Sequence, residues 1–347
     1  MKIRLLEPLG VPAEMISELA KPLLDAGHEF TYYDTKTTDP EELKKRSAGQ
    51  DIVMIANNAY PAAVVESADT LKMIAVAFTG IDHVSTEGCR EKNIMICNCA
   101  GYSNVCVSEL CIGMVINLYR YLQQADQAVR NGGTSAGLCG REIRGKKVGI
   151  IGCGQIGFMT AKLFQAFGAE VYAYARHERE EVKAAGIAYK PLDDLLRECD
   201  IISLHTPNNK ETRGMISAEK IALMKKSAIF INCARGPIVD SKALAQALNE
   251  GRIAGAAVDV FDCEPPIPAE EPLLHAKNTL LTPHVAFLSE EAMVRRAKIE
   301  FSNVYSYLVG KPENFCSLLC GDESSTRTYF RIHLYFSKKF CYNLCVT

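Results

Sequence analysis

Arg235, Glu264 and His284 each follow a short apolar run late in the chain, and together they suit the chemistry of a 2-oxo acid. An arginine fork can bind a carboxylate and polarise the carbonyl group beside it. Histidine, with an ordinary pKa of about 6.5, can donate a proton to the alkoxide that forms, and a carboxylate on its other ring nitrogen fixes the imidazole tautomer. We therefore expect substrate binding, polarisation and proton transfer from these three residues.

Each of these residues also has a purely structural interpretation. Arg235 can be a surface arginine after a strand, His284 a loop residue after a proline, and Glu264 part of a turn before two prolines. Ligands of open α/β sheets bind at the carboxyl ends of the strands, which share one edge of the sheet. Because all three residues follow runs expected to be such strands, we favour a joint site, with His83 as a rival acid.

The pattern Gly152-x-Gly154-x-x-Gly157 follows an apolar run and opens a helical stretch, Gln155–Phe167, which is the context in which it binds a dinucleotide. Gly152 permits a tight turn, Gly154 lets pyrophosphate approach the backbone, and Gly157 allows close packing of helix on strand. The phosphates would lie at the positive end of the helix. A glycine-rich turn without ligand is the alternative. Combined with the three reacting residues, the loop predicts hydride transfer.

The residues after the next expected strand predict which dinucleotide binds. An acid about 20 residues beyond the first glycines usually holds the ribose 2′-hydroxyl of NAD. Here that position is Ala175, followed by Arg176 and Arg179. No carboxylate repels a 2′-phosphate, and a guanidinium can bind one through two parallel hydrogen bonds. We predict NADP(H); in the alternative, both arginines are solvated, Glu178 binds the ribose and the cofactor is NAD.

The first hundred residues contain further candidates for substrate contacts. Phe78, Thr79 and Gly80 follow an apolar run, and their backbone N–H groups can form a concave array that binds the substrate carboxylate opposite Arg235. The candidate wall residues, which lie on loops expected to face the cleft, are Asn57, Asn58 and Tyr102.

These residues need strands to position them, and the first part of the chain alternates strands with helices. Five apolar runs of strand length are separated by stretches of helical composition, which predicts a small, mostly parallel sheet. The expected strands are Ile3–Leu6, Phe30–Tyr33, Asp51–Ile55, Met73–Ala77 and Ile94–Cys97, and the expected helices are Glu14–Leu24, Glu41–Arg46 and Ala62–Ala68.

A second series predicts a dinucleotide-binding sheet. Apolar residues spaced three and four apart indicate one long helix over Val105–Val129, and a final helix is expected over Glu290–Leu308. Six strands with intervening helices suit a doubly wound fold. They are expected at Val148–Ile151, Val171–Tyr174, Ile201–His205, Ile229–Asn232, Ala256–Val260 and Thr279–Thr282. The predicted fold class is therefore α/β, with two doubly wound parallel-sheet domains.

Length, charge and composition exclude several classes of protein. The 347 residues suffice for two domains, and 48% hydrophobic residues with a net charge of −2 indicate a soluble globular protein without a basic surface for nucleic acid. The N-terminus lacks a signal pattern, and no apolar run reaches the roughly 18 residues of a membrane span. We expect a cytoplasmic protein with no membrane partner, in which most of the fourteen cysteines are reduced.

The end of the chain breaks the pattern. Residues 318–347 are rich in aromatic side chains but continue no strand–helix unit, so we expect an extension outside both cores, unselected or disordered. Cys316, Cys320, Cys341 and Cys345 leave a metal clip open as an alternative, although their spacing differs from that of common zinc sites. We predict no metal.

Taken in order, these motifs resemble those of the D-isomer-specific 2-hydroxyacid dehydrogenases, the family of phosphoglycerate dehydrogenase, glyoxylate and hydroxypyruvate reductases and D-lactate dehydrogenase. The likeness covers about residues 1–317. Besides the glycine loop, the segments that carry it are Ala77–Val84, Gly101–Glu109, Leu204–Pro207, Asn232–Asp240, Asp259–Pro265 and Thr282–Ala286. The chain departs from the family at Ala175, where many relatives carry an acid, and at Asn104, where they often carry proline.

The resemblance implies roles for individual residues. Arg235 would bind and polarise the substrate, Glu264 would partner His284, and His284 would be the acid–base. The residues that it implies along the nicotinamide and elsewhere on the cofactor are Asp259, Thr206, Ala234, Gln155, Ile156, Pro207, Cys233 and Ala286.

The resemblance also implies the domain organisation and the activity. A dinucleotide-binding domain over 102–286 would interrupt a flavodoxin-like substrate domain of residues 1–101 and 287–317, and the family usually forms a homodimer through its cofactor domains. The expected activity is reduction of a small 2-oxo acid to its D-2-hydroxy acid with NAD(P)H. The alternatives are oxidation of formate or phosphite by the same residues, and a nucleotide-sensing, corepressor-like binding protein of this fold.

Overall fold

The computed structural model describes residues 1–263 and 266–316. Glu264, one of the predicted catalytic residues, and the predicted extension over 318–347 lie outside the described residues, as do the cysteines of the alternative metal clip beyond Cys316. The chain forms two compact units. Among the described residues, one consists of Met1–Cys99 and residues 296–316, and the other of Ala100–Arg295.

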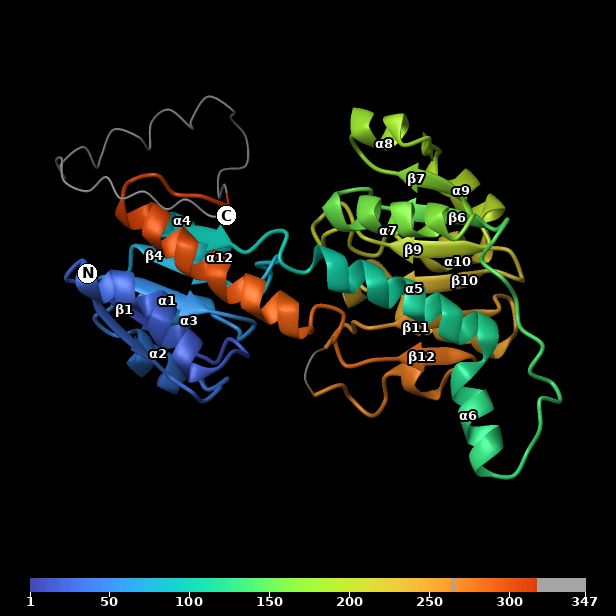
Figure 1. Cartoon of the computed structure of the whole chain (residues 1–347), viewed down its shortest axis with the longest axis horizontal. Helices are drawn as coiled ribbons and strands as arrows, with labels where there is room; N and C mark the ends of the chain where they lie inside the picture. The colour runs from blue at the N-terminus through green and yellow to red at the C-terminus, as the bar shows by residue number, and fades with distance from the viewer. Residues whose placement is uncertain (264–265, 317–347) are drawn as a thin grey trace. The chain divides into compact units, whose positions relative to one another are not determined.

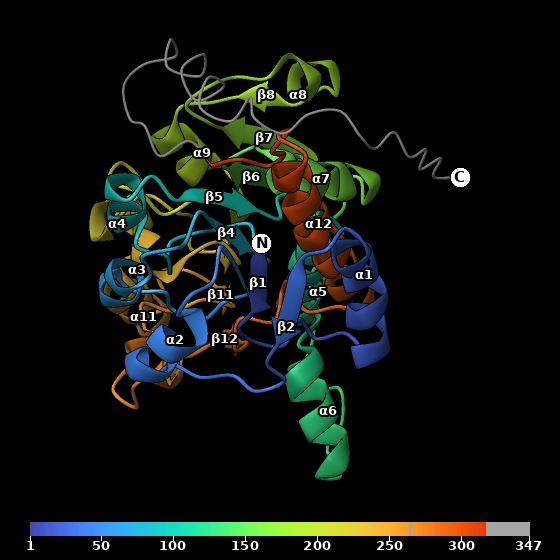
Figure 2. The same cartoon turned by 90° about the vertical axis from the view of Figure 1, so that its left-hand side faces the viewer.

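The first unit is a five-stranded parallel sheet in the order β2-β1-β3-β4-β5. Helices α1 and α12 lie on one face of this sheet, and α2, α3 and α4 lie on the other (Figure 2). β3 (Ile52–Ile55) and β4 (Met73–Val76) are buried at every residue, because the sheet is covered on both sides. The other elements are β1 (Lys2–Leu5), β2 (Glu29–Tyr32), β5 (Met95–Asn98), α1 (Ala13–Asp25), α2 (Pro40–Ser47), α3 (Ala62–Ser67) and α4 (Thr86–Glu91).

From Arg296 onward, helix α12 (Glu290–Leu308) belongs to this first unit, which is therefore built from two separate stretches of chain. Arg296 Nη2 donates a hydrogen bond to the carbonyl oxygen of Leu9 at 2.6 Å. Asn303 Nδ2 donates to the carbonyl oxygen of Asn98 at 2.8 Å. These bonds attach the helix to loops at the carboxyl ends of β1 and β5.

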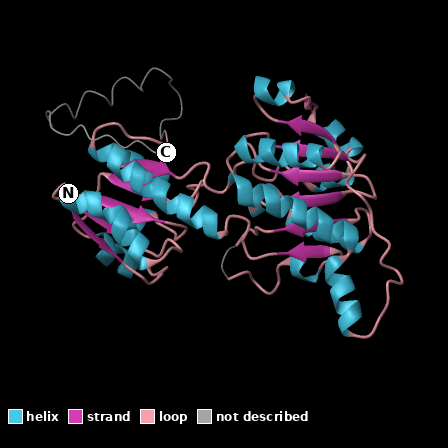
Figure 3. Ribbon diagram, viewed as in Figure 1, coloured by secondary structure: helices cyan, strands magenta, loops and turns pink. Residues whose placement is uncertain are grey.

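The second unit is a seven-stranded parallel sheet in the order β12-β11-β10-β9-β6-β7-β8 (Figure 1 and Figure 3). The chain reverses direction across the sheet between β6 and β9, as in a doubly wound dinucleotide-binding fold. One core lies under α5 and α7, and a second core lies under α9, α10 and α11. The predicted fold class, with two doubly wound parallel sheets, is confirmed.

The strands of this second sheet are β6 (Lys147–Ile151), β7 (Glu170–Tyr174), β8 (Ala188–Tyr189), β9 (Ile201–Leu204), β10 (Ile229–Asn232), β11 (Gly255–Val258) and β12 (Thr279–Leu281). The helices are α5 (Asn104–Arg120), α6 (Leu122–Arg130), α7 (Gln155–Ala166), α8 (Glu180–Ala184), α9 (Leu192–Glu198), α10 (Ala218–Ala222) and α11 (Ser241–Asn249), with short 3₁₀ turns η1 (Gly236–Ile238) and η2 (Pro272–His275). The two-residue strand β8 is missing from the sequence prediction because it is too short to show a period.

The single long helix predicted over Val105–Val129 is wrong. Tyr121 takes a left-handed backbone conformation with φ 53°, which ends α5 and starts α6 at an angle of 56°. Within the described residues, no single helix is long and apolar enough to cross a membrane. The bent pair α5–α6 together has the length and apolar composition of a membrane span. Seven residues of α5 are buried, as in the core helix of a folded unit.

Candidate active site

The carboxyl ends of the strands in the second unit bring many of the predicted site residues to one edge of its sheet. Gly152 follows β6, Thr206 and Pro207 come after β9, and Cys233 to Arg235 follow β10. Asp259 follows β11, and the turn that carries His284 follows β12. Because every strand is parallel to its neighbours, these ends share the same edge. Glu264 lies outside the described residues, so its position relative to this edge is not described.

Two glycines of the glycine loop have no room for a side chain. Gly152 has φ 92°, and a Cβ there would lie 2.7 Å from the carbonyl carbon of His205. A Cβ on Gly157 would lie 2.1 Å from the carbonyl oxygen of Gly152. Gly154 differs, because no atom lies within 4 Å of the position that its Cβ would occupy. The structure thus has a tight strand–helix turn with open space beside Gly154.

The groups around this space fit a dinucleotide. Helix α7 begins after Gly154 with no side chain capping its first N–H groups, which leaves them for an anion. The hydroxyl oxygen of Thr206 is buried and has no hydrogen-bond partner among the described residues. The side-chain oxygen of Gln155 accepts a hydrogen bond from Asn104 Nδ2 at 2.9 Å. The group of Gln155 that can bind a ligand at the start of the helix is therefore its backbone N–H.

The segment after β7 carries two arginines and no acid at the specificity position. Arg179 Nη1 donates a hydrogen bond to the carbonyl oxygen of Cys153, inside the glycine loop, at 3.2 Å. Its Nη2 forms an ion pair with Glu181. The exposed Arg176 lies 2.5 Å from Glu211. Glu178, the alternative ribose ligand, pairs with Lys183 at 2.8 Å.

Arg235 leaves β10 through a loop whose backbone is held by Asn232. The buried Asn232 accepts from the N–H of Ala234 at 3.0 Å and donates to the carbonyl oxygen of Arg235 at 3.1 Å. Arg235 Nη1 donates to the carbonyl oxygen of Ala234 at 2.7 Å. Sequence reasoning missed Asn232; its signal was an amide at the end of an otherwise apolar strand.

Gly236 next to Arg235 is required for close packing. A Cβ at this position would lie 2.1 Å from the carbonyl carbon of Phe261, so the loops after β10 and β11 touch through their backbones. Gly236 does not have a positive φ, so freedom to turn is not what the site needs from it.

Asp259 organises the turn that carries His284. The carboxylate is fully buried and accepts from Thr282 Oγ1 at 2.5 Å and from the N–H groups of Val285 and Ala286 at 2.8 and 2.9 Å. The N–H of His284 donates to the carbonyl oxygen of Asp259 at 2.8 Å. Burial raises the pKa of the Asp259 carboxyl, and these hydrogen bonds oppose that rise.

His284 itself has a left-handed backbone with φ 53°, which is uncommon for a residue with a side chain. Its ring lies 5.5 Å from that of Phe287, edge to face. The Asp259 bonds to the flanking residues stabilise this conformation, so the direction of the imidazole is determined by the turn.

The predicted substrate residues of the first unit lie after β3 and β4. Asn98 Nδ2 donates to the carbonyl oxygen of Thr79 at 2.8 Å, next to the buried Phe78 and the half-buried Gly80. Asn57 is exposed, whereas the side chain of Asn58 is buried. Tyr102, which lies in the second unit, is buried, with its carbonyl oxygen accepting from Arg295 at 2.9 Å.

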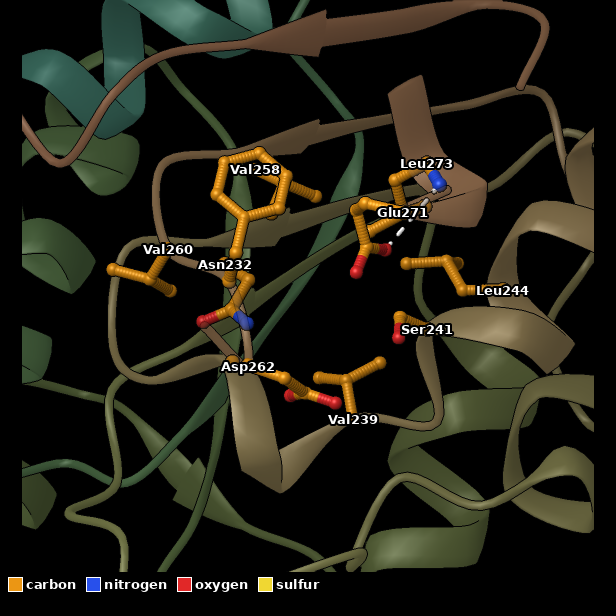
Figure 4. Close-up of a pocket in the computed structure, with 11 residues that line it drawn as sticks. Asn232, Val239, Ser241, Leu244, Val258, Val260, Asp262, Glu271 and Leu273 are labelled. Carbon is orange, nitrogen blue, oxygen red and sulfur yellow. Dashed lines mark hydrogen bonds between the residues drawn. The ribbon is translucent and has the colours of Figure 1, made fainter. Parts of the chain in front are cut away.

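The pocket drawn in Figure 4 is too small to be the substrate site. It lies among β10, β11, α11 and η2, where Asn232, Ser241 and Glu271 form part of its wall. Its volume is about 10 Å³, which holds at most one water molecule. Among the described residues there is also no group of three His, Cys, Asp or Glu side chains placed to bind a metal ion.

Comparison with known proteins gives consistent matches over most of the chain. The family described as D-isomer specific 2-hydroxyacid dehydrogenase, NAD binding domain, matches residues 112–286. A hydroxypyruvate reductase of Blautia hydrogenotrophica is 34% identical over 299 residues, which cover 84% of this chain and 92% of that protein.

Two solved structures show the same fold. An acyclic imino acid reductase in complex with NADPH and D-Arg has a TM-score of 0.82 and 28% identity, over 91% of this chain and 100% of the other. A D-lactate dehydrogenase from Aquifex aeolicus, complexed with NAD and lactic acid, has a TM-score of 0.77 and 28% identity, over 89% and 96%.

Proposed function

The chain belongs to the D-isomer-specific 2-hydroxyacid dehydrogenase family, and we propose that it reduces a small 2-oxo acid to the D-2-hydroxy acid with NADPH. Family membership makes it an oxidoreductase that transfers a hydride with a nicotinamide dinucleotide. The observation that supports the finer proposal is the shared edge of the second sheet, where Arg235, the Asp259-bound turn of His284 and the glycine loop all follow the carboxyl ends of parallel strands.

Each residue has a distinct part in the proposed reaction. A dinucleotide held at the glycine loop would supply the hydride that reduces the carbonyl carbon. Arg235 binds the carboxylate and withdraws charge from the carbonyl oxygen. His284 donates the proton to the carbonyl oxygen, and Glu264 is the acid proposed to assist it. Asp259 and Asn232 hold the loops from which these groups project.

The activity is tested by turnover of glyoxylate, hydroxypyruvate and pyruvate with NADPH and with NADH. We expect oxidation of the nucleotide with at least one of the three acids. Reduction of NAD(P)⁺ by formate or phosphite, without turnover of any 2-oxo acid, would favour the alternative enzyme. Binding of nucleotide with no turnover of any of these compounds would favour a binding protein.

The preference for NADPH rests on Ala175, Arg176 and Arg179. We expect a higher kcat/KM for NADPH than for NADH, because a guanidinium can pair with the 2′-phosphate and no acid at position 175 repels it. Ala175→Asp should lower the NADPH to NADH ratio by at least tenfold, because its carboxylate repels the phosphate and can accept from the ribose hydroxyl. A wild-type preference for NADH would contradict the assignment.

We also propose a cytoplasmic homodimer. Helix α6 has no buried residue, and its Leu122 and Val129 side chains are exposed, as expected for a helix that packs against another copy. Light scattering after size exclusion should give twice the mass of the chain. Leu122→Asp with Val129→Asp should shift the mass to that of a single chain if this helix is part of the interface.

A further inference from the structure

An ion pair joins the two loops on either side of the glycine loop in the second unit. In the sheet, β6 lies between β9 and β7, and the glycine loop follows β6 (Figure 1). Arg176 lies shortly after β7, and Glu211 lies in the loop after β9. Arg176 Nη1 lies 2.5 Å from Glu211 Oε2. The pair therefore connects the two segments that border the expected place of the adenosine half of a dinucleotide.

The backbone of Glu211 is held by the loop that carries it. Asn209 Oδ1 accepts hydrogen bonds from the N–H of Glu211 at 2.9 Å and from the N–H of Thr212 at 3.1 Å. Thr212 Oγ1 donates to the carbonyl oxygen of Pro207 at 2.6 Å. The carboxylate of Glu211 thus reaches Arg176 from a fixed turn.

The two arginines after β7 differ in how far their donors are already used. Arg179 donates through Nη1 to the carbonyl oxygen of Cys153 at 3.2 Å and pairs through Nη2 with Glu181. Arg179 therefore ties the glycine loop to the segment after β7. The side chain of Arg176 is 67% exposed, and among the described residues its one ion-pair partner is Glu211. Arg176 is the arginine that can turn towards a phosphate.

A carboxylate beside Arg176 opposes the binding of a phosphate at the same place. The guanidinium carries one positive charge, and the carboxylate of Glu211 balances it before any ligand binds. A phosphate monoester carries about −1.5 to −2 charges at neutral pH. To pair with Arg176 it must displace Glu211 or lie beside it, and both weaken its binding. The ribose hydroxyl of NAD is uncharged, so Glu211 does not oppose it in this way.

We propose that Glu211 is a specificity-determining residue for the cofactor, which competes with the ribose 2′-phosphate for Arg176 and so limits the preference for NADP(H) over NAD(H). The inference rests on the proposed function, because it takes a dinucleotide at the glycine loop and Arg176 as the ligand of its 2′-phosphate. It adds that the preference results from two opposing side chains on two loops. An ion pair this exposed contributes little to stability, so Glu211 can be replaced without unfolding the protein.

The test measures Kd for NADP⁺ and NAD⁺, which differ only in the 2′-phosphate, by isothermal titration calorimetry. Glu211→Gln keeps an oxygen that can accept from Arg176 and removes the charge. We expect it to lower Kd for NADP⁺ at least about threefold and to change Kd for NAD⁺ less than about twofold, because the charge acts on the phosphate. An unchanged Kd for NADP⁺ would overturn the inference. A higher Kd would also overturn it, because Glu211 would then orient Arg176 for the phosphate.

The matched control is Glu250→Gln. Glu250 is an exposed glutamate after α11, paired with Arg252 at 2.8 Å. It lies shortly before β11, away from the carboxyl ends of the strands. Its replacement removes the same charge, and we expect both Kd values to stay within about twofold of the wild type. A similar gain in NADP⁺ affinity in this variant would reduce the effect of Glu211 to that of net charge and overturn the inference.

Replacing Arg176 tests whether Glu211 acts through it. In Arg176→Met the phosphate loses its ligand, so adding Glu211→Gln should change Kd for NADP⁺ by less than about twofold, a non-additive result. The same gain in both backgrounds would show that Glu211 acts without Arg176, against the inference.

The proposed function and this inference fail in different measurements. A wild type that binds NAD⁺ more tightly would contradict the proposed NADPH preference, whereas the role of Glu211 is decided by the change in the Kd ratio on its replacement. Absence of 2-oxo acid turnover would contradict the proposed activity without affecting the binding comparison. A wild type that binds neither nucleotide would overturn both.

Discussion

At the scale of single residues, Asp259 links stability to the proposed catalysis. Its carboxylate accepts three hydrogen bonds from the turn over 282–286, and two of the donors are backbone N–H groups. Asp259→Ala leaves these donors without a partner in a buried position, so we expect a loss of about 3–5 kcal/mol in the free energy of unfolding, measured by urea denaturation. Asp126→Ala, which removes an exposed ion pair with Arg130, should cost less than about 1 kcal/mol.

The proposed proton donor gives a prediction about activity. His284→Ala should lower kcat by about 10²–10⁴ with the best 2-oxo acid, because no group then protonates the carbonyl oxygen. NADPH binding, followed by fluorescence titration, should change by less than about threefold. His275→Ala, an exposed histidine of η2, is the matched control. Near-normal turnover in His284→Ala would transfer the acid role to another residue, with His83 as the rival.

The residues that sequence reasoning found and missed differ in where their partners lie. The position of Arg235, Asp259 and His284 at one sheet edge could be predicted, because each follows an apolar run and the ends of parallel strands meet. Asn232 and Glu7 could not be assigned a role from the sequence. Glu7 binds backbone groups 49 and 51 residues away, and nothing in the local pattern indicates that pairing.

At the scale of elements, the break between α5 and α6 has no sequence signal. The apolar spacing continues through Tyr121, and neither glycine nor proline marks the end of α5. A tyrosine at φ 53° pays a steric penalty that glycine avoids, so the structure around it must favour the bend.

This conformation predicts opposite effects for two small substitutions at Tyr121. Both Tyr121→Gly and Tyr121→Ala remove the ring, but only glycine adopts the left-handed region without strain. We expect Tyr121→Gly to be more stable than Tyr121→Ala by about 1 kcal/mol in the free energy of unfolding. If the alanine variant is the more stable one, α5 and α6 form a continuous helix in solution.

At the scale of the whole molecule, the fold class was predictable and the path of the chain was less so. Fully buried strands such as β3, β4, β9 and β10 appear in the sequence as short continuous apolar runs, and their alternation with helices predicts parallel sheets. The order of the strands and the return of α12 to the first sheet depend on contacts such as Arg296 to Leu9, which join residues 287 positions apart. Periodicity carries no information about them.

That returning helix also introduces a buried acid whose ionisation should affect stability. Glu300 is fully buried, and neither of its oxygens has a hydrogen-bond partner among the described residues. Burial raises the pKa of its carboxyl well above the ordinary range; Arg296 on the same helix opposes the rise, and Glu7 adds to it. Cys99 is also within electrostatic range. The folded state therefore favours the protonated form.

The sign of the pH dependence follows from this difference between the folded and unfolded chain. In the unfolded chain the carboxyl of Glu300 has a pKa of about 4.3. Because its pKa is higher in the folded state, the stability gained from the protonated form is complete below about pH 4.3 and is lost as the pH rises towards the folded pKa. Glu300→Gln is neutral at every pH. We expect it to match the wild type near pH 4.5 and to exceed its free energy of unfolding by at least about 1 kcal/mol at pH 8, measured by urea denaturation. Glu291→Gln, at an exposed position of α12, is the control and should show the same free energy of unfolding as the wild type across this range. If the difference between Glu300→Gln and the wild type does not change with pH, Glu300 titrates in the folded protein as it does in the unfolded chain, which would contradict the prediction.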